Sequence, residues 1–125
     1  MDGFDATAVE AEIRAAFDAY EAALMGNDVD GLVGLFWADP RAVRLTADGG
    51  AWGHGEIAAF RRGRDASDIT RALTRVEIVA LSADIGVANA TYRRTGSGRK
   101  GAQSQTWIRT AEGWRIASAH VSLGS

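Results

Sequence analysis

Residues 70–123, TRALTRVEIVALSADIGVANATYRRTGSGRKGAQSQTWIRTAEGWRIASAHVSL, decide the fold of this chain. They divide into four strand-like segments, at about 70–81, 84–95, 102–110 and 113–123, in which β-branched and aromatic residues recur. The separators between these segments suit hairpin turns: Ser82-Ala83-Asp84, Gly96-Ser97-Gly98 and Ala111-Glu112-Gly113. The stretch therefore predicts a four-stranded antiparallel meander.

The N-terminal part of the chain is mainly helical in pattern. Thr7 and Glu10 form the S/T-x-x-E pattern of a capping box. Apolar residues then recur at helical spacing to about residue 25: Val9, Ile13, Phe17, Tyr20 and Leu24. Asp28 or Asp30 can cap a second short helix, which ends before Asp39-Pro40. These two segments predict a helical hairpin.

Between the helical part and the meander, residues 42–46 predict a strand, and a turn at 47–50 leads to a brief second strand near 51–52. Residues 55–62 predict a third helix. The order lacks the alternating strands and helices that build parallel sheets. We therefore expect one α+β domain over residues 1–125, in which N-terminal helices cover a curved antiparallel sheet and enclose a cone-shaped pocket.

Composition narrows the possible function classes. The chain has 125 residues, with 14 Lys and Arg against 16 Asp and Glu, so no general basic field is available for nucleic acid. The absence of cysteine rules out disulfides and thiolate nucleophiles. No apolar run approaches the length of a membrane span, and the N-terminus is acidic where a secretory signal is basic. We expect a cytoplasmic protein without nucleic-acid or membrane partners.

The basic residues are almost all arginine, and they are unevenly placed. Arg61, Arg62 and Arg64 crowd one stretch, while Arg41 and Arg44 flank another. The planar guanidinium binds carboxylates and phosphates through paired hydrogen bonds. GC-rich coding explains an arginine excess equally well, so the pattern alone leaves both readings open.

Motifs for metal or cofactor binding are not evident. His54 and His120 are the only histidines, and their spacing matches no common metal-ligand pattern. The segment Gly53-His54-Gly55 is too short to be a dinucleotide or phosphate-binding loop. We therefore predict neither a metal nor a cofactor.

Two residues in the first half of the chain are candidates for chemistry. Tyr20 shares a helical face with Ile13 and Phe17, so its ring should point toward the sheet, either as a core tyrosine or as a proton donor. Arg44 lies in the middle of an apolar strand, where it is either a surface charge or an inward anion ligand. The sequence leaves both choices open.

The last two strands carry faces that are half polar. Strict alternation places Ser118 and His120 on one face with Trp114 and Ile116. In the preceding strand Gln103, Gln105, Trp107 and Arg109 share a face. Such faces can line a wet cavity, although a core histidine with a satisfied hydrogen bond is the alternative for His120.

The order of elements, with the closing Gly113-Trp114-Arg115-Ile116 and His120-x-Ser122, resembles the nuclear-transport-factor-2-like, or SnoaL-like, cone superfamily. Within it the chain is similar to the AtzH/HpxZ family, from about Val9 to Leu123. Three separated blocks carry this resemblance: Phe36-Trp37-x-Asp39-Pro40-Arg41-x-Val43-Arg44, Glu56-Ile57-x-x-Phe60-Arg61 and Gln103-Ser104-Gln105-Thr106-Trp107-Ile108-Arg109. The superfamily hosts many activities, so the fold alone specifies none.

The resemblance implies a cofactor-independent lyase that decarboxylates 1,3-dicarboxyurea to allophanate, in cyanuric acid and oxalurate catabolism beside amidase-type hydrolases. It implies a small anionic substrate, with Tyr20 and Arg44 as the essential pocket residues. We add, as expected substrate-binding residues, Arg41, Gln105, Trp107, Ser118 and His120. A homodimer and a functional association with an amidase are also expected. The family pattern has a glycine and a glutamate where this chain has Thr46 and Gly49.

Two alternatives accompany this interpretation. The chain can be a non-catalytic ligand-binding or assembly subunit of an amidase system, because a sheet face rich in Trp and Arg suits pairing with another subunit. It can also be another SnoaL-like isomerase or hydrolase. We rank this last, because an internal carboxylate base is hard to find: Asp39 precedes Pro40 and is expected in a turn.

Overall fold

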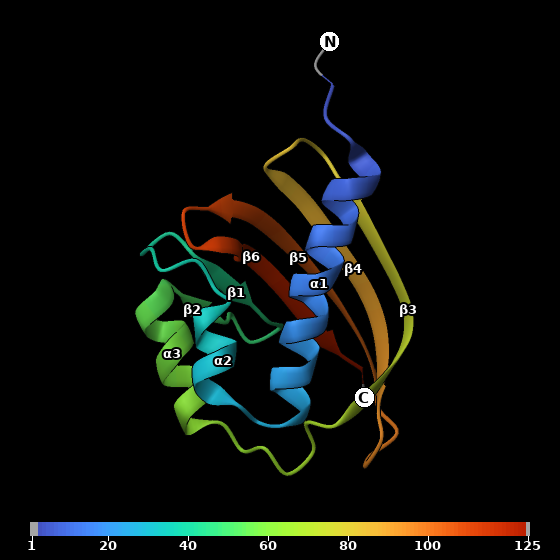
Figure 1. Cartoon of the computed structure of the whole chain (residues 1–125). Coiled ribbons are helices and arrows are strands. Elements are labelled where there is room, and N and C mark those ends of the chain that lie inside the picture. The colour runs from blue at the N-terminus through green and yellow to red at the C-terminus, as the bar shows by residue number, and fades with distance from the viewer. Residues whose placement is uncertain (1–2, 125) are drawn as a thin grey trace.

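The structure is a computed structural model that describes residues 3–124. It confirms the predicted order of a helical part followed by a meander (Figure 1). The elements are α1 (Ala6–Met25), α2 (Val29–Gly34), β1 (Val43–Leu45), β2 (Ala51–Trp52), α3 (His54–Gly63), β3 (Arg71–Ala80), β4 (Ile85–Arg94), β5 (Lys100–Thr110) and β6 (Gly113–Leu123).

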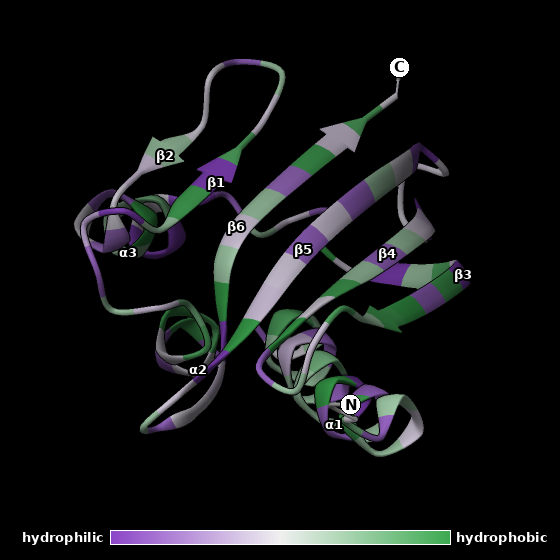
Figure 2. Ribbon diagram, turned by 90° about the horizontal axis from the view of Figure 1, so that it is seen from above, coloured by the Kyte–Doolittle hydropathy of each residue, from purple (hydrophilic) through white to green (hydrophobic). Residues whose placement is uncertain are grey.

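The six strands form one curved sheet in the order β2-β1-β6-β5-β4-β3. All neighbours run antiparallel except β1 and β6, which are parallel, so the first hairpin joins the meander through its last strand. Helix α1 crosses the inner face and packs against β3, β4 and β6. Figure 2 shows α1 and α2 on the same side of the sheet. The predicted α+β cone is confirmed.

The helix starts show one correction to the predicted caps. Asp5, not Thr7, is the N-cap of α1, and its carboxylate accepts a hydrogen bond from the backbone N–H of Ala8. Glu10 does not cap the helix. Its carboxylate accepts a hydrogen bond from the backbone N–H of Ala80, which links α1 to the end of β3. Of the two predicted caps of α2, Asp28 and Asp30, the structure has Asp28, whose carboxylate accepts from the backbone N–H of Gly31.

A β-bulge in β6 corrects the predicted strand faces. The register shifts so that Ile116 faces Trp107 while Ser118 faces Thr106, which leaves Ala117 as the extra residue. One extra residue exchanges the two faces of everything that follows it. Trp114 and Ile116 therefore point inward, but Ser118 and His120 point outward and are exposed. The predicted common face of these four residues is wrong.

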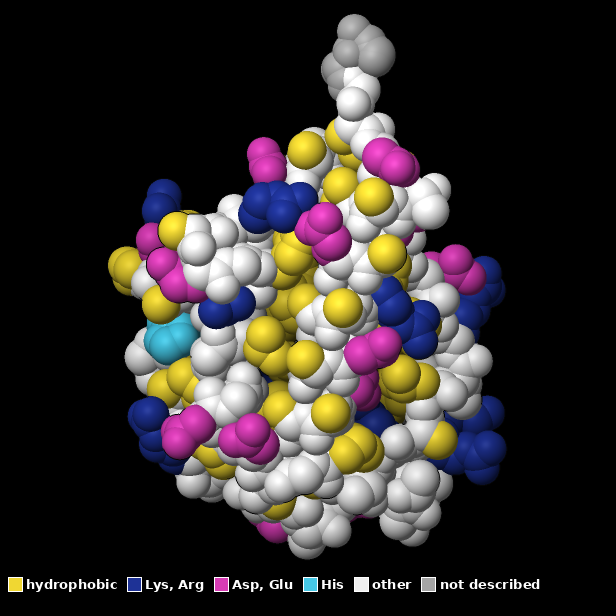
Figure 3. Space-filling view, viewed as in Figure 1, with side chains coloured by type: hydrophobic (Ala, Val, Ile, Leu, Met, Phe, Trp, Pro, Cys, Tyr) yellow, Lys and Arg dark blue, Asp and Glu magenta, His cyan; other side chains and the backbone are white. Residues whose placement is uncertain are grey.

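The core lies between α1 and the inner face of the sheet. Ile13 and Phe17 of α1 are fully buried, as are Trp107 and Ile116 of the sheet. Gly86 permits this close approach, because a Cβ at that position would collide with the side chain of Ile13. Figure 3 shows hydrophobic side chains gathered along the boundary between α1 and α2, which is the edge of this core.

Candidate active site

A pocket opens at the end of the core, between the C-terminal half of α1, the strand β1, helix α3 and the adjoining ends of β3, β4, β5 and β6. It holds about 320 Å³ of empty space including its mouth. Only about 20 Å³ of it is closed space that a water-sized atom can reach, well below the range of about 300–1,000 Å³ typical of small-molecule sites. The lining residues are Tyr20, Leu24, Arg44, Arg61, Arg64, Ile69, Arg71, Tyr92, Arg94, Gln103 and Val121. A small and strongly basic pocket results.

Tyr20 lies at the inner wall of this pocket. Its helical spacing from Ile13 and Phe17 turns it toward the sheet, and it is buried, with its ring edge-on to Phe36 at 6.2 Å between centroids. The phenol oxygen accepts a hydrogen bond from Nη2 of Arg61. A guanidinium can only donate, so the hydroxyl hydrogen of Tyr20 is left to donate to another group. The buried phenol lines the pocket and keeps a hydrogen that it can donate.

Arg44 points inward from β1, which settles the direction that the sequence left open. It is only 6% exposed, and its strand neighbours on the same face are Ala51 and Ala119, whose small side chains leave room for the guanidinium. Nε is buried and has no hydrogen-bond partner within residues 3–124. Burial, followed by the charge of Arg61, lowers the pKa of Arg44 to about 10. An anion placed here would relieve both penalties.

Helix α3 and its C-cap residue, Arg64, supply two more guanidiniums to the same wall. Arg61 is 3% exposed, and its Nε and Nη1 atoms are buried without a partner among the described residues. Burial, followed by the charge of Arg61, lowers the pKa of Arg64 to about 10. The ring of Phe60 lies below all three cations, with its centroid 4.5 Å from Cζ of Arg44, 5.5 Å from Arg61 and 5.6 Å from Arg64. Cation–π attraction to this ring partly offsets the like-charge repulsion.

The opposite wall of the pocket contains arginines that are already neutralised. Arg71 pairs with Glu21 at 2.5 Å and donates to Oε1 of Gln103 at 2.9 Å, with its guanidinium 4.3 Å from the ring centroid of Tyr92. Arg94 pairs with Asp68 at 3.6 Å. By contrast, no carboxylate within residues 3–124 forms an ion pair with an arginine on the α3 side. The uncompensated positive charge is confined to that side.

Comparison with known proteins places this chain in a family. The family model described as AtzH-like matches residues 2–125. The chain belongs to the AtzH-like family. A protein of unknown function from the DUF3225 family of Pectobacterium atrosepticum has a solved structure that is 47% identical, with a TM-score of 0.89 over 94% of this chain and 92% of that one. The search of curated proteins found no match.

Two further structures support the fold. A cystatin-like fold protein from Burkholderia xenovorans is 31% identical, with a TM-score of 0.89 over 98% of both chains. An NTF2-like protein of unknown function from Pseudomonas putida is 19% identical, with a TM-score of 0.80 over 96% of this chain and 89% of that one. The resemblance to the nuclear-transport-factor-2-like cone is thereby confirmed for this AtzH-like chain.

The other residues predicted to bind substrate lie outside the pocket of this AtzH-like protein. Gln105 and Trp107 are on the inner face of β5, as predicted, but they are buried in the core, where Nε1 of Trp107 donates to Oε1 of Gln105 at 3.1 Å. Ser118 and His120 are on the outer face because of the bulge. Arg41 is exposed, pairs with Asp39 and lies over Trp37. None of these five residues lines the pocket with Tyr20.

Several pocket residues were not singled out by the sequence analysis as site residues. The clearest is Arg61, which follows the buried Ile57 by four positions and therefore shares its helical face. This spacing predicts that Arg61 faces inward, as Ile57 does. The pairing of Arg71 with Glu21 joins residues 50 positions apart, and no local sequence pattern predicts it. Thr46 and Asp48, near the family departures, line a neighbouring hollow that also reaches Arg44.

The described part of the chain contains neither a metal-binding cluster nor a membrane-spanning helix. No group of three or more His, Asp or Glu side chains in residues 3–124 is arranged to hold a metal ion. None of the helices there is long and apolar enough to cross a bilayer. The arrangement is therefore one that can bind a small anion, remove it from water and offer it one buried hydroxyl donor.

Proposed function

We propose that this AtzH-like protein is a decarboxylase that converts a small N-carboxylated urea, 1,3-dicarboxyurea, to allophanate and carbon dioxide. One observation carries the proposal: the buried hydroxyl of Tyr20 accepts from Arg61 and lines the same pocket as Arg44, whose Nε is buried without a partner in residues 3–124. The pocket thus combines a proton donor with an anion ligand, which are the two groups that this reaction requires.

In the proposed reaction the bond between the urea nitrogen and a carboxylate carbon breaks. The electron pair stays on the nitrogen, carbon dioxide leaves, and the hydroxyl of Tyr20 transfers its proton to that nitrogen. The charge of Arg61 stabilises the phenolate formed in this step, and solvent then returns a proton to the phenolate. One proton is consumed, and a dianion becomes a monoanion.

The role of Arg44 in this proposal is to bind and orient the substrate. A guanidinium that is already desolvated forms charge-assisted hydrogen bonds with a carboxylate without losing more water, so the pocket is preorganised for an anion. Orientation of the urea nitrogen toward Tyr20 then makes the proton transfer effectively unimolecular. The expectation that Arg44 and Tyr20 are the reactive pair is retained on these grounds.

The pocket gives less support to the isomerase or hydrolase alternative. Such chemistry on this fold requires a carboxylate base facing the substrate, whereas Glu21 is bound to Arg71 and Asp68 to Arg94. A carboxylate held by a guanidinium is a poor base. The non-catalytic ligand-binding alternative would use the same basic pocket, so only an activity measurement separates it from decarboxylation.

The test is to add purified protein to freshly generated dicarboxyurea and to follow carbon dioxide release. We expect Tyr20→Phe to reduce kcat by about 10²- to 10⁴-fold, the usual contribution of general acid catalysis. Tyr92→Phe should lose less, because that hydroxyl already donates to the carbonyl of Ser122. Failure of the wild type to accelerate release would contradict the proposal. Full activity in folded Tyr20→Phe would instead refute only the assignment of the proton donor.

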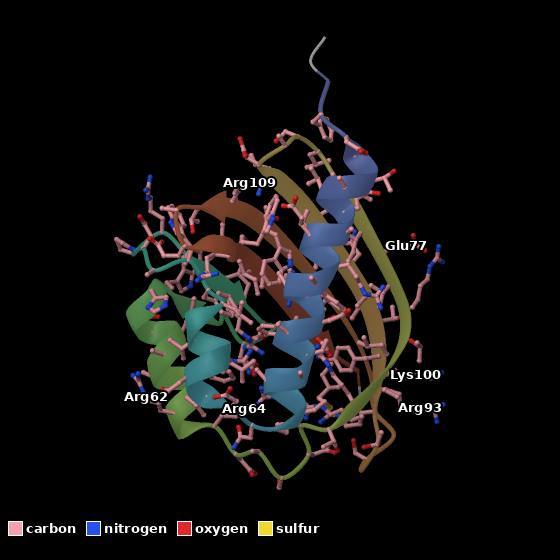
Figure 4. All side chains as sticks on the ribbon, in the orientation of Figure 1. Arg62, Arg64, Glu77, Arg93, Lys100 and Arg109 are labelled. Atoms are coloured by element: carbon pink, nitrogen blue, oxygen red, sulfur yellow. The ribbon has the colours of Figure 1, made fainter. Side chains whose placement is uncertain are left out.

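We also propose that two copies of the chain pair through the outer face of the sheet. Arg75, Glu77 and Arg93 are exposed there, so the face carries both signs of charge, which suits a self-complementary two-fold interface. Figure 4 shows Glu77 and Arg93 projecting away from α1. Sedimentation equilibrium is expected to give a dimer, and addition of a neighbouring amidase would test the expected association; a monomer that ignores the amidase contradicts both.

A further inference from the structure

We propose that Arg61 and Arg64, held over the ring of Phe60, form a second anion subsite, so that the pocket selects small dianions over monoanions. The inference deepens the proposed function and rests on it for the identity of the natural ligand. The binding preference itself can be measured without any turnover.

The α3 wall of the pocket carries an excess of positive charge. Arg44, Arg61 and Arg64 are three cations without a carboxylate partner in residues 3–124, whereas the arginines of the opposite wall are neutralised. A single carboxylate bound to Arg44 would leave two positive charges uncompensated in a partly desolvated pocket. A second carboxylate removes most of this excess, and like-charge repulsion therefore favours a dianion.

Two guanidinium donors of Arg61 are unused within residues 3–124. Nη2 of Arg61 is occupied by the phenol oxygen of Tyr20, but Nε and Nη1 are buried without a partner in the described chain. Arg61 as a whole residue is 3% exposed, so water does not satisfy these donors as it would at a surface. A carboxylate oxygen beside Arg61 would satisfy one of them directly.

Arg61 lies in the last turn of α3, and Arg64 is the C-cap residue that follows the helix end. The ring centroid of Phe60 is 5.5 Å from Cζ of Arg61 and 5.6 Å from Cζ of Arg64, so both guanidiniums lie over the same ring. Arg62, which directly follows Arg61 in sequence, is exposed and does not line the pocket. Figure 4 shows Arg62 on the outer side of α3 and Arg64 closer to α1. The chain thus offers an adjacent arginine of the same helix as a matched control.

This subsite should favour release of the product. The substrate enters with two negative charges, and the monoanionic product has lost one of its two charge-assisted interactions. A charge-assisted hydrogen bond contributes enough to change affinity by about 10- to 100-fold. We therefore expect the product to bind more weakly than the substrate by about that factor, which favours its release.

The experiment measures the affinity of two stable probes by calorimetry at one fixed ionic strength. Glutarate places two carboxylates at the ends of a five-atom chain, as dicarboxyurea does, and butyrate is the same chain with one carboxylate removed. For the wild type we expect glutarate to bind about 10- to 100-fold more tightly than butyrate. Equal affinities for the two probes would overturn the proposal.

Variants assign the preference to the subsite. Arg64→Gln should bring the ratio of the two affinities to threefold or less, and Arg64→Lys, which keeps the charge but not the planar fork, should retain part of it. Arg62→Gln should leave the ratio unchanged. A full ratio in folded Arg64→Gln and Arg61→Gln would overturn the assignment, as would an equal loss in Arg62→Gln. Folding of each variant is checked by its thermal unfolding.

The outcomes also separate this inference from the proposed function. If glutarate is preferred through Arg64 but dicarboxyurea is not consumed, the subsite stands and the decarboxylase proposal fails. If carbon dioxide is released but butyrate binds as well as glutarate, the reaction stands and the subsite is wrong.

Discussion

Replacement of Arg44 by methionine is expected to make the ligand-free protein more stable. The pKa of Arg44 falls well below its ordinary value, to about 10, first because of burial and next because of Arg61, so the folded state disfavours its charged form. A shift of this size corresponds to about 3 kcal/mol at neutral pH. Methionine keeps an unbranched apolar stem over Phe60 but loses the cation–π attraction, which offsets about 1–2 kcal/mol of the gain.

The net expectation for Arg44→Met is a rise of about 1–2 kcal/mol in the free energy of unfolding, or about 3–10 °C in Tm. The sign of the pH dependence follows from the lowered pKa. Below pH 10 both folded and unfolded wild type carry the charge, so the penalty is fully present; it is relieved only as the pH rises above 10 toward the ordinary pKa of an arginine. The difference between variant and wild type should therefore be constant across neutral pH.

Urea unfolding at pH 7, in a buffer without phosphate or sulfate, is the appropriate assay, with Arg62→Met as the control on an exposed arginine. The control should change the free energy of unfolding by less than about 0.5 kcal/mol. Salt should stabilise the wild type more than Arg44→Met, because it screens repulsion that the variant lacks. A loss of 1 kcal/mol or more in Arg44→Met would refute the reasoning, since it would mean that the guanidinium is favourably paired.

Three further changes test other contacts. Glu21→Gln leaves Arg71 buried and unpaired, and urea unfolding should show a loss of about 3–5 kcal/mol. Gly86→Ala forces a Cβ against Ile13 and should lower Tm through a loss of about 1–3 kcal/mol. Asp39, whose pKa falls to about 2 through hydrogen bonds from the neighbouring arginine, should contribute stability that disappears between about pH 4 and 2; Asp39→Asn, titrated by unfolding over that range, should lack this loss.

The fold was predictable because its main signals are local and periodic. The apolar spacing of α1 and the turn residues between the meander strands each specify an element without reference to the rest of the chain. The predictions that were wrong, the strand faces after Ala117 and the cap of α1, depend on single residues. The bulge at Ala117 carries no special residue type, and yet it reverses the faces of Ser118 and His120. The cap of α1 was misplaced because Asp5 and Thr7 both suit such a position.

Only part of the site could be predicted from the sequence, for a similar reason. Tyr20 and Arg44 were selected through the family resemblance, whereas composition and spacing left their directions open. Arg61 was within reach of helical periodicity, since it shares a face with Ile57. Gln105 and Trp107 were given the correct face, but alternation says only that a side chain is inside, not whether it meets a pocket or the core.

The division of the pocket into two walls explains why residue type alone does not identify the ligand-binding side. Both walls present arginine, and the difference lies in partners that are distant in sequence: Glu21 neutralises Arg71, while Arg44 and Arg61 have no such partner among residues 3–124. A buried pair holds the wall in place, but a buried unpaired cation only destabilises the folded chain. Its retention is therefore accounted for by the ligand, and a variant that is more stable and inactive is the expected signature of such a residue.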